Sequence, residues 1–452
     1  MPISNVQSMR MLLFFCFLIS ILVNAQDGFV LQDKDKTVIH FKLINNLIFV
    51  PMSVNGVELN FMLDSGIAET LLFSLENKNV DFKNVEKITF RGLGETVSVD
   101  ALKSINNEVK IGSHFLDRSH TVFIVLDEEF NISQDVGIPV NGILGYYFFK
   151  NHPAEINYLN KTITIYKDSS KFPKRIRRYS DFPMTVELNK PYMYADVEMK
   201  HDKQSSKLLL DLGNTDSVWL FPTLIKDFIY NRPNIDDFLG RGFSGDIYGK
   251  RSRINSLSIG KFRMSKPIAS MPDEYSIQHL RIVKDRKGSI GSEVLRRFYV
   301  IFDYTGGKVY FRANKHLNDP FLIDGSGLEI KQEGLIWEKE EVRVETAKRN
   351  SSGNEINVVD NSPDKFQYKF SLKPVFKVSG TRKDSPAQKS GIMKGDEIIN
   401  VDGKKANDLT LSKIHEILKT DEARKISIEI KRNNILQKIN LLLEDPIPYI
   451  EE

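Results

Sequence analysis

Short segments of alternating hydrophobic and polar residues fill most of the chain from about residue 39 to residue 315. Alternation with a period of two is typical of β-strands that bury one face, and turn residues separate the segments. Asn55-Gly56 stands between VPMSV and VELNFML, and it favours a two-residue hairpin turn because both positions need positive φ. YVIFDY and KVYFRA flank a second turn at Thr305-Gly306-Gly307. The pattern predicts a mainly β fold.

An aspartate motif occurs twice in this region. FMLDSGI at 61–67 and LLLDLGN at 208–214 each place an aspartate after a hydrophobic, strand-like run and before X-Gly. Three landmarks recur at nearly the same offset: the aspartates Asp64 and Asp211, the later glycines Gly145 and Gly291, and the segments RGLGE (91–95) and RGFSG (241–245). The repetition predicts two homologous lobes, each of which contributes one carboxylate to the interface between them.

A pair of carboxylates at such an interface has a defined chemistry. Two neighbouring carboxylates cannot both ionise easily, so the pair shares one proton. The ionised member can take a proton from water while the protonated member donates to a substrate carbonyl, and this needs no metal or cofactor. The eight histidines show no HExxH motif or clustered metal-binding spacing, and the chain has no GxSxG or phosphate-binding loop. We predict neither a metal nor a cofactor.

With both motifs and their tails, residues from about 39 to 315 resemble the pepsin-like aspartic proteases, a bilobal family related to the retropepsins; SIGSEVLRRFYVIFDYTGGKVYF is the most similar stretch. The resemblance implies two pepsin-like β lobes with a cleft between them and endopeptidase activity on extended protein or peptide substrates. One chain carries both aspartates, so we expect a monomer. The resemblance assigns catalysis to Asp64 and Asp211, support of the dyad to Ser65, Gly66, Gly213 and Asn214, and a flap tip to Arg91, Gly92, Leu93 and Gly94.

The chain departs from the family after the second aspartate. The family usually has Thr or Ser after each aspartate, and these hydroxyls form hydrogen bonds across the lobe junction. Ser65 fits, but Leu212 has no hydroxyl and would leave Ser65 without its usual partner. The departure keeps an alternative open, a catalytically weak or inactive relative that binds peptides or proteins. A structural β protein of the cell envelope is a further alternative that leaves the paired motifs unexplained.

The residues after the two motif glycines predict an unequal pair of carboxyl groups. Asn214 can donate a hydrogen bond to Asp211, whereas Ile67 offers no donor to Asp64. A donor stabilises the charged form of a carboxyl group and lowers its pKa. We therefore expect Asp211 to be the more acidic member and Asp64 to carry the shared proton.

A different pattern, strands around the helical segment LTLSKIHEIL, begins near residue 368. DSPAQKSGIMKGDEIINVDGKKA at 384–406 resembles PDZ domains. The resemblance implies a small α+β domain that binds a C-terminal or internal peptide by adding it as a strand to a sheet edge. We expect its peptide-carboxylate loop near Ser371–Val375. The polar stretch at 346–366 is typical of a flexible insertion or long loop.

The chain begins with the features of an export signal. Arg10 precedes the apolar run at 11–23, which is shorter than the roughly 20 residues that a membrane helix needs. Val23 and Ala25 provide small residues for cleavage. An uncleaved anchor is the alternative. We expect an exported protein, periplasmic, cell-surface or secreted, without a membrane span after cleavage. Cys16, the only cysteine, lies in the leader, so the mature chain would form no disulfide.

The patterns divide the chain into a signal peptide (1–25), an N-terminal aspartic protease lobe (26–168), a basic linker (169–183), a C-terminal lobe (184–316), a connecting segment (317–366) and a PDZ domain (367–446). We interpret the cations of the linker as solvated charges. The formal net charge of +4 does not predict a nucleic-acid partner.

Overall fold

The computed structural model describes residues 28–91, 98–125, 130–199, 202–225, 228, 232–242, 245–278, 281–343, 345–349, 355–359 and 366–450. The predicted signal peptide lies outside the described residues, as do Gly92, Leu93 and Gly94 of the predicted flap. Within the described part, no helix is long and hydrophobic enough to cross a membrane.

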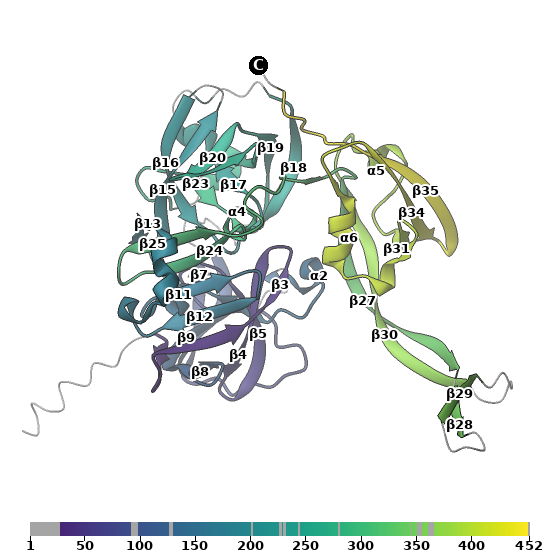
Figure 1. The fold of residues 1–452 in the computed structure, drawn as a ribbon, viewed down its shortest axis with the longest axis horizontal. Helices are drawn as coiled ribbons and strands as arrows, with labels where there is room; N and C mark the ends of the chain where they lie inside the picture. The colour runs from purple at the N-terminus through teal and green to yellow at the C-terminus, as the bar shows by residue number, and fades with distance from the viewer. Residues whose placement is uncertain are drawn as a thin grey trace, which may run out of the picture.

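The N-terminal lobe, lobe one, is built on a nine-stranded sheet (Figure 1). Its strands are β1 (Val30–Leu31), β3 (Lys42–Ile44), β4 (Leu47–Val54), β5 (Val57–Leu63), β6 (Leu71–Leu72), β7 (Val85–Arg91), β8 (Ser98–Ile111), β9 (Phe115–Val125) and β10 (Gly142–Leu144). Their order is β1-β9-β6-β10-β5-β4-β8-β7, with β3 paired to β4. Asn55 and Gly56 join β4 to β5 with φ of 48° and 88°, which confirms the predicted hairpin turn.

The C-terminal lobe, lobe two, has a ten-stranded sheet. Its strands are β14 (Thr185–Glu187), β15 (Lys190–Met199), β16 (Asp202–Leu210), β17 (Val218–Leu220), β18 (Asn234–Gly242), β19 (Gly245–Arg253), β20 (Ser256–Ile259), β21 (Phe262–Ser265), β22 (Ile268–Pro272) and β23 (Arg286–Ile290). The order β22-β17-β23-β16-β15 repeats β9-β6-β10-β5-β4 of lobe one. The shared topology confirms the predicted pair of homologous β lobes.

A six-stranded sheet joins the two lobes. Its strands are β2 (Lys36–His40), β11 (Ala154–Asn157), β12 (Thr162–Tyr166), β13 (Ser180–Pro183), β24 (Phe298–Asp303) and β25 (Lys308–Ala313). The order is β13-β25-β24-β11-β12-β2, so lobe one supplies three strands, lobe two and the preceding linker supply the other three, and β11 meets β24 at the centre. This symmetry about the junction is what a duplicated lobe requires.

The predicted basic linker is more ordered than the sequence suggested. It contains two 3₁₀ turns, η4 (Ser169–Lys171) and η5 (Lys174–Arg178), and then strand β13. Arg175 pairs with the buried Glu155 at 2.8 Å, and the hydroxyls of Tyr166 and Tyr179 donate to the same carboxylate. Arg175 therefore ties the connection to lobe one through the buried Glu155, although its own side chain, like the other cations of this segment, is exposed.

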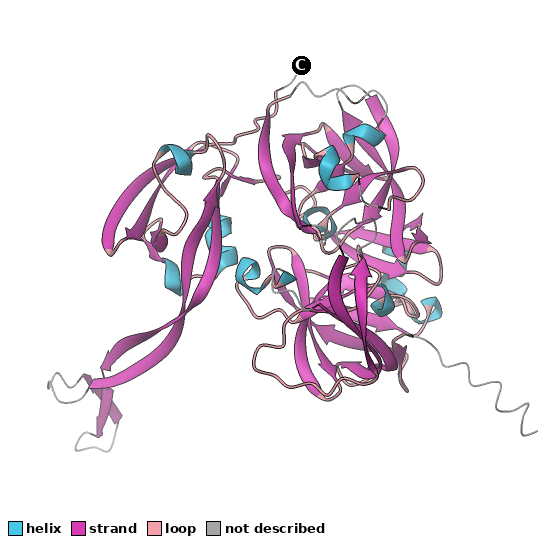
Figure 2. Cartoon of the chain, turned by 180° about the vertical axis from the view of Figure 1, so that it is seen from behind, coloured by secondary structure: helices cyan, strands magenta, loops and turns pink. Residues whose placement is uncertain are grey.

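The C-terminal domain has its own hydrophobic core and a mixed α and β composition (Figure 2). Its strands are β26 (Ile323–Asp324), β27 (Leu328–Arg343), β28 (Glu345–Arg349), β29 (Glu355–Val359), β30 (Phe366–Thr381), β31 (Glu397–Val401), β32 (Lys404–Lys405), β33 (Lys419–Thr420), β34 (Arg424–Arg432) and β35 (Ile435–Leu443). The helical elements are α5 (Pro386–Lys389), η7 (Ala406–Asp408) and α6 (Leu411–Leu418). The main sheet runs β27-β30-β31-β34-β35, so β27 is an edge strand.

Two sequence expectations for this region differ from the structure. The predicted connecting segment contains β27, which belongs to the C-terminal sheet. β27 and β30 continue to pair past the rest of this sheet and form a long hairpin arm that projects from the domain (Figure 1). The expected insertion at 346–366 contains most of the short hairpin β28–β29. The sequence missed the arm because its strands have exposed hydrophobic residues on a polar background, such as Trp337 at 69% exposure.

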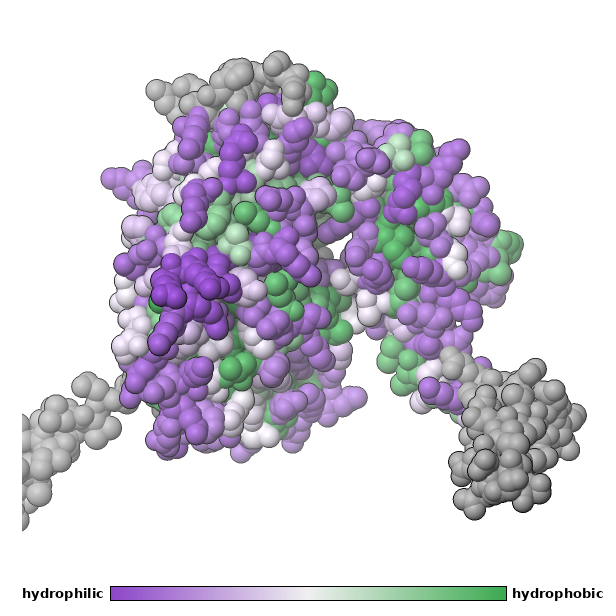
Figure 3. Space-filling model, viewed as in Figure 1, coloured by the Kyte–Doolittle hydropathy of each residue, from purple (hydrophilic) through white to green (hydrophobic). Residues whose placement is uncertain are grey.

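The end of the chain attaches this domain to lobe two. Ile447 is fully buried in the large protease core, and its carbonyl accepts a hydrogen bond from Arg253. Arg253 also pairs with Asp445 at 2.9 Å and donates to the carbonyl of Phe321. Figure 3 shows hydrophobic residues on the side of the lobes that faces the C-terminal domain. The domain is thus held at both of its ends.

Candidate active site

The two aspartates follow equivalent strands. β5 ends at Leu63, and the backbone N–H of Asp64 donates to the carbonyl of Leu144 at 3.0 Å. β16 ends at Leu210, and the N–H of Asp211 donates to the carbonyl of Ile290 at 2.9 Å. The later motif of each lobe therefore forms the strand, β10 or β23, that runs parallel to the strand before the aspartate.

Gly145 and Gly291, which directly follow β10 and β23, are required because the aspartate loops pack closely against them. A Cβ atom at Gly145 would lie 2.5 Å from the carbonyl oxygen of Ile67, and one at Gly291 would lie 2.2 Å from that of Asp216. Real Cβ atoms do not approach this closely, so each aspartate loop rests on a position that has no side chain. The recurrence of glycine in the two tails thus has a steric cause.

The structure brings Asp64 and Asp211 together across the lobe junction. A Cβ atom at Gly213 would lie 2.3 Å from Cγ of Asp64, and one at Gly66 would lie 2.8 Å from Oδ1 of Asp211. Each motif glycine therefore packs against the carboxyl group of the opposite lobe.

The environment holds a proton on this pair. Burial raises the pKa of both carboxyl groups. For Asp211, burial and the nearby charge of Asp64 together raise the pKa to about 7. For Asp64, hydrogen bonds from the backbone of Gly66, at 2.6 Å, and of Gly213 oppose the effect of burial on the pKa. The raised pKa of both groups favours a state in which the buried pair shares one proton.

In the part of the chain that the structure describes, the hydrogen bond that the sequence predicted from Asn214 to Asp211 is not formed. The side-chain oxygen of Asn214 accepts a hydrogen bond from the backbone N–H of Asp216 at 2.9 Å. Among the described residues, Asn214 is not a donor to Asp211, which accepts instead from the N–H of Gly213 at 3.1 Å. The expectation failed because a short amide side chain satisfies its own turn first.

Ser65 has partners, contrary to the expectation from Leu212. Its hydroxyl donates to the carbonyl of Leu210 at 2.6 Å and accepts from the N–H of Leu212 at 3.0 Å. Both partners are backbone groups of lobe two, so they do not depend on the side chain at position 212. The side chain of Leu212 is fully buried in the protease core. One hydroxyl therefore connects the lobes beneath the dyad.

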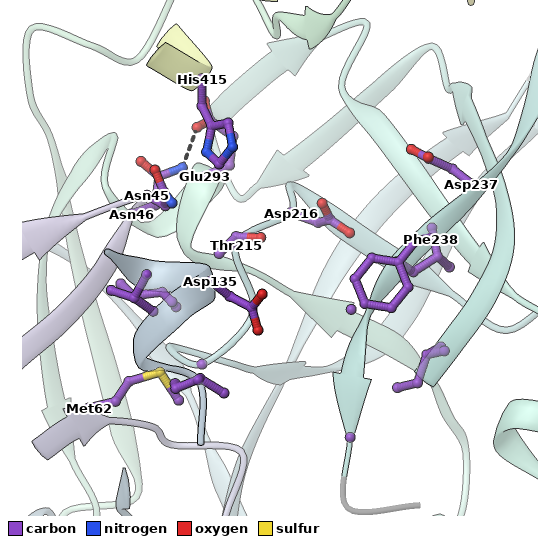
Figure 4. A pocket seen from close by; sticks show the side chains of 18 of the residues that line it. Asn45, Asn46, Met62, Asp135, Thr215, Asp216, Asp237, Phe238, Glu293 and His415 are labelled. Atoms are coloured by element: carbon purple, nitrogen blue, oxygen red, sulfur yellow. Dashed lines mark hydrogen bonds between the residues drawn. The ribbon is translucent and has the colours of Figure 1, made fainter. Parts of the chain in front are cut away.

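A large cavity of about 1830 Å³ opens in front of the dyad. Both lobes and the C-terminal domain line it, and Figure 4 shows Met62 and Asp135 of lobe one, Asp216 and Phe238 of lobe two and His415 of α6 around it. Asp135 lies on the short helix α2 (Ser133–Val136). The described part of the lobes also contains the short helices η3 (Tyr146–Phe148), η6 (Pro222–Leu224), α3 (Glu274–Ile277) and α4 (Ser292–Leu295).

The predicted flap begins at the end of strand β7. Arg91 is the last residue of β7, and the three residues predicted after it lie outside the described residues. The equivalent hairpin of lobe two, β18–β19, borders the cavity through residues such as Asp237, Phe238 and Ile247. In lobe one the described pairing of β7 with β8 extends to Arg91 and Ser98, and in lobe two that of β18 with β19 extends to Gly242 and Gly245.

Sequence reasoning missed several charged residues at the site. Lys190 lines the cavity and interacts electrostatically with both dyad carboxylates. Arg251 pairs with Asp216 at 2.6 Å and with Asp237 at 2.7 Å. None of them belongs to a motif, and only the fold brings them near the aspartates. Among the described residues, no group of three or more His, Cys, Asp or Glu is arranged to hold a metal ion.

Comparison with known families agrees with this geometry. A family model described as aspartyl protease matches residues 50–148, which include Asp64. A second model, described as PDZ domain, matches residues 355–443. The chain carries an aspartyl protease domain and a C-terminal PDZ domain. A search of curated proteins found no match. The protease match covers lobe one, and the repeated topology extends the resemblance to lobe two.

The PDZ domain lies against the protease cleft. Lys331 of its edge strand β27 pairs with Asp135 of lobe one at 3.2 Å, and a Cβ atom at Gly137 would lie 3.1 Å from Cβ of Leu411. Residues 371–375, expected to form the peptide-carboxylate loop, lie within strand β30, so this expectation was wrong. β27 instead follows a tight turn in which Asp324 accepts from the N–H groups of Ser326 and Gly327.

Proposed function

We propose that this protein is an aspartic endopeptidase whose catalytic residues are Asp64 and Asp211. The observation that carries the proposal is the reciprocal packing of Gly66 and Gly213 against the carboxyl group of the opposite lobe. This contact unites two motifs that are far apart in the sequence at one buried point. The large cavity in front of that point has room for an extended peptide.

The proposed mechanism gives the negative charge of the proton-sharing pair to Asp64, whose carboxylate accepts hydrogen bonds from the backbone of Gly66 and Gly213. Asp64, the ionised member, takes a proton from a water molecule, whose oxygen attacks the carbonyl carbon of the peptide bond. Asp211 donates its proton to the carbonyl oxygen, so a neutral tetrahedral intermediate forms. Asp64 then returns a proton to the nitrogen as the C–N bond breaks, and Asp211 regains one from the intermediate. Ser65, Gly66 and Gly213 hold the pair in place.

The PDZ domain supplies a second peptide-binding surface in this proposal. PDZ domains add an extended peptide as a strand to a sheet edge. The edge strand β27 and helix α6 border the same cavity as Asp64, through residues such as Ile330 and Ser412. A substrate or partner peptide held there would lie next to the cleft. We further propose that the protein acts as a monomer and is exported.

Cleavage of a denatured protein between pH 3 and pH 7 tests the proposal. We expect cleavage that a statine-type inhibitor blocks and that Asp64→Asn and Asp211→Asn each abolish. A folded protein that binds peptides but cleaves none under these conditions would support the alternative, an inactive relative that acts through binding. The substitution of Leu212 favours that alternative on sequence grounds, whereas the two partners of Ser65 remove its structural basis.

A further inference from the structure

Equivalent positions beside the two aspartates are hydrophobic in lobe one and partly cationic in lobe two. Phe49 pairs with Met62, two residues before Asp64, and Tyr192 pairs with Leu209, two residues before Asp211. Phe49 and Tyr192 are therefore equivalent. Two residues earlier on the same strands, Leu47 of lobe one is equivalent to Lys190 of lobe two.

A second pair of positions shows the same change. Arg286 lies five residues before Gly291, and Val140 lies five residues before Gly145. In lobe one, Leu47, Phe49 and Val140 belong to one hydrophobic cluster beside the cleft. In lobe two, the same three positions are Lys190, Tyr192 and Arg286. The duplication has thus placed two cations on one side of the dyad and none at the equivalent positions on the other.

Three acidic side chains of lobe two on this side of the molecule pair with cations other than Lys190. Glu187, which faces it across the β14–β15 hairpin, pairs with Lys207 at 2.6 Å. Asp216 and Asp237, further along the cavity, both pair with Arg251. Among the described residues, Lys190 makes no ion pair, and it is half-buried in the wall of the cavity.

Arg286 adds a second positive charge behind this wall. It is 9% exposed, its guanidinium lies 5.1 Å from the ring centre of Phe221, and its Nε donates to the carbonyl of Gly288. It interacts electrostatically with Asp211 and with Lys190. A dyad that shares one proton carries a single negative charge. The charges of Lys190 and Arg286 together therefore exceed the single negative charge of the dyad beside them.

We infer that the lobe-two side of the cleft is a subsite for an acidic side chain, in which Lys190 binds the Asp or Glu carboxylate of a substrate next to the scissile bond. The equivalent lobe-one subsite, beside Leu47 and Met62, receives a hydrophobic side chain. The inference rests on the proposed endopeptidase function and adds the class of peptide that is cleaved. An acidic substrate residue would add the second negative charge that Lys190 and Arg286 can bind beside the dyad.

Peptide pairs that differ only by Glu or Gln beside the scissile bond test this subsite. At pH 6 the Glu side chain is ionised, while Gln has the same shape without charge. We expect wild-type protein to cleave the Glu peptides with about tenfold higher kcat/KM, which is the effect of roughly 1.4 kcal/mol. Lys190→Met should bring the ratio to about one, and Lys190→Arg should keep the preference. Lys203→Met, a surface lysine on β16 paired with Asp196, is the matched control and should leave the ratio unchanged.

A wild-type ratio near one would overturn the subsite, and so would an unchanged ratio in Lys190→Met. A Lys190→Met variant with a shifted pH–rate profile but the wild-type ratio would also overturn it, because Lys190 would then act only on the dyad. If no peptide is cleaved at all, equilibrium binding of the same peptides separates the two proposals. A Glu preference in binding that Lys190→Met removes would support the subsite and reject the endopeptidase, whereas equal binding would reject both.

Discussion

The two lobes share a backbone and differ in the side chains around the dyad. Their central strands have the same order, and each aspartate loop packs on a glycine of its own lobe. Yet beneath the dyad Ser65 of lobe one provides a hydroxyl that connects the lobes, whereas the equivalent Leu212 is a buried hydrophobic residue. The difference shows that a duplicated site needs symmetric backbone geometry more than symmetric side chains. Backbone N–H and carbonyl groups remain in place whatever side chain follows the aspartate.

The largest effect is expected where the lobes are functionally equal. Asp64→Asn and Asp211→Asn should each lower kcat by about 100-fold to 10,000-fold or more, because either change removes one member of the proton-sharing pair. Turnover of a denatured protein substrate, together with circular dichroism to check the fold, measures this. Near-normal turnover in either variant would show that this aspartate is not catalytic.

Substitution of the two motif glycines should reduce activity to different extents in the two lobes. Gly213→Ala would place Cβ 2.3 Å from Cγ and Oδ2 of Asp64, whereas Gly66→Ala would place it 2.8 Å from Oδ1 of Asp211. We expect both variants to lose activity, with the larger loss, about 100-fold, for Gly213→Ala. Side-by-side measurement of kcat in the two variants tests the order. A more active Gly213→Ala variant would contradict the close packing across the junction.

The protonation of the dyad should make stability depend on pH. Burial raises the pKa of Asp211 from 3.8 to about 7, so the folded state holds this proton more tightly than the unfolded chain. The stabilising contribution is therefore complete below about pH 4 and is lost as the pH rises to about 7. The change should be on the order of a few kcal/mol. Urea unfolding across this range should show the decline in wild-type protein and a flatter profile in Asp211→Asn.

The lobe junction provides a fourth test. Ser65→Ala would leave the buried carbonyl of Leu210 and the N–H of Leu212 without their partner, at a cost of about 1–3 kcal/mol for each buried group left unpaired. Leu212→Thr should also destabilise the protein, by about 1–3 kcal/mol, because it shortens a fully buried side chain. We expect no gain in turnover from Leu212→Thr. Higher turnover without loss of stability would mean that the second hydroxyl is missing from the site.

The sequence was sufficient to predict the architecture of the protease because duplication is visible as repeated spacing. The strand–Asp–X–Gly motifs, the tail glycines and the Asn55-Gly56 turn each have one local conformation that satisfies them. The PDZ domain was recognisable for the same reason, through glycines at fixed turns. Local patterns of this kind require no knowledge of distant partners.

The parts of the site that depend on distant partners could not be predicted. Lys190 lies far in sequence from Asp64, and only the lobe junction brings them near. The partners of Ser65 are backbone groups, which carry no signature in the sequence. Strand β27 was missed because its pairing with β30 crosses a polar stretch that hid the start of the C-terminal sheet. Local sequence patterns do not predict the features that depend on contacts between residues far apart in the chain.

The smallest effect is expected at Asn214, where the comparison between the lobes is most subtle. The sequence suggested that Asn214 lowers the pKa of Asp211, but its side-chain oxygen accepts from the N–H of Asp216. Asn214→Ala should therefore cost about 1 kcal/mol of stability through the lost turn bond and leave the pH–rate profile unchanged.

Ile67→Ser, at the equivalent position of lobe one, introduces a hydroxyl next to Asp64 and is the matched variant. If it shifts the acidic limb of the profile while Asn214→Ala does not, the donors that matter are those on the ionised member, Asp64. A shift in Asn214→Ala instead would mean that its amide reaches Asp211 in the working enzyme, and the roles of the two aspartates would have to be exchanged.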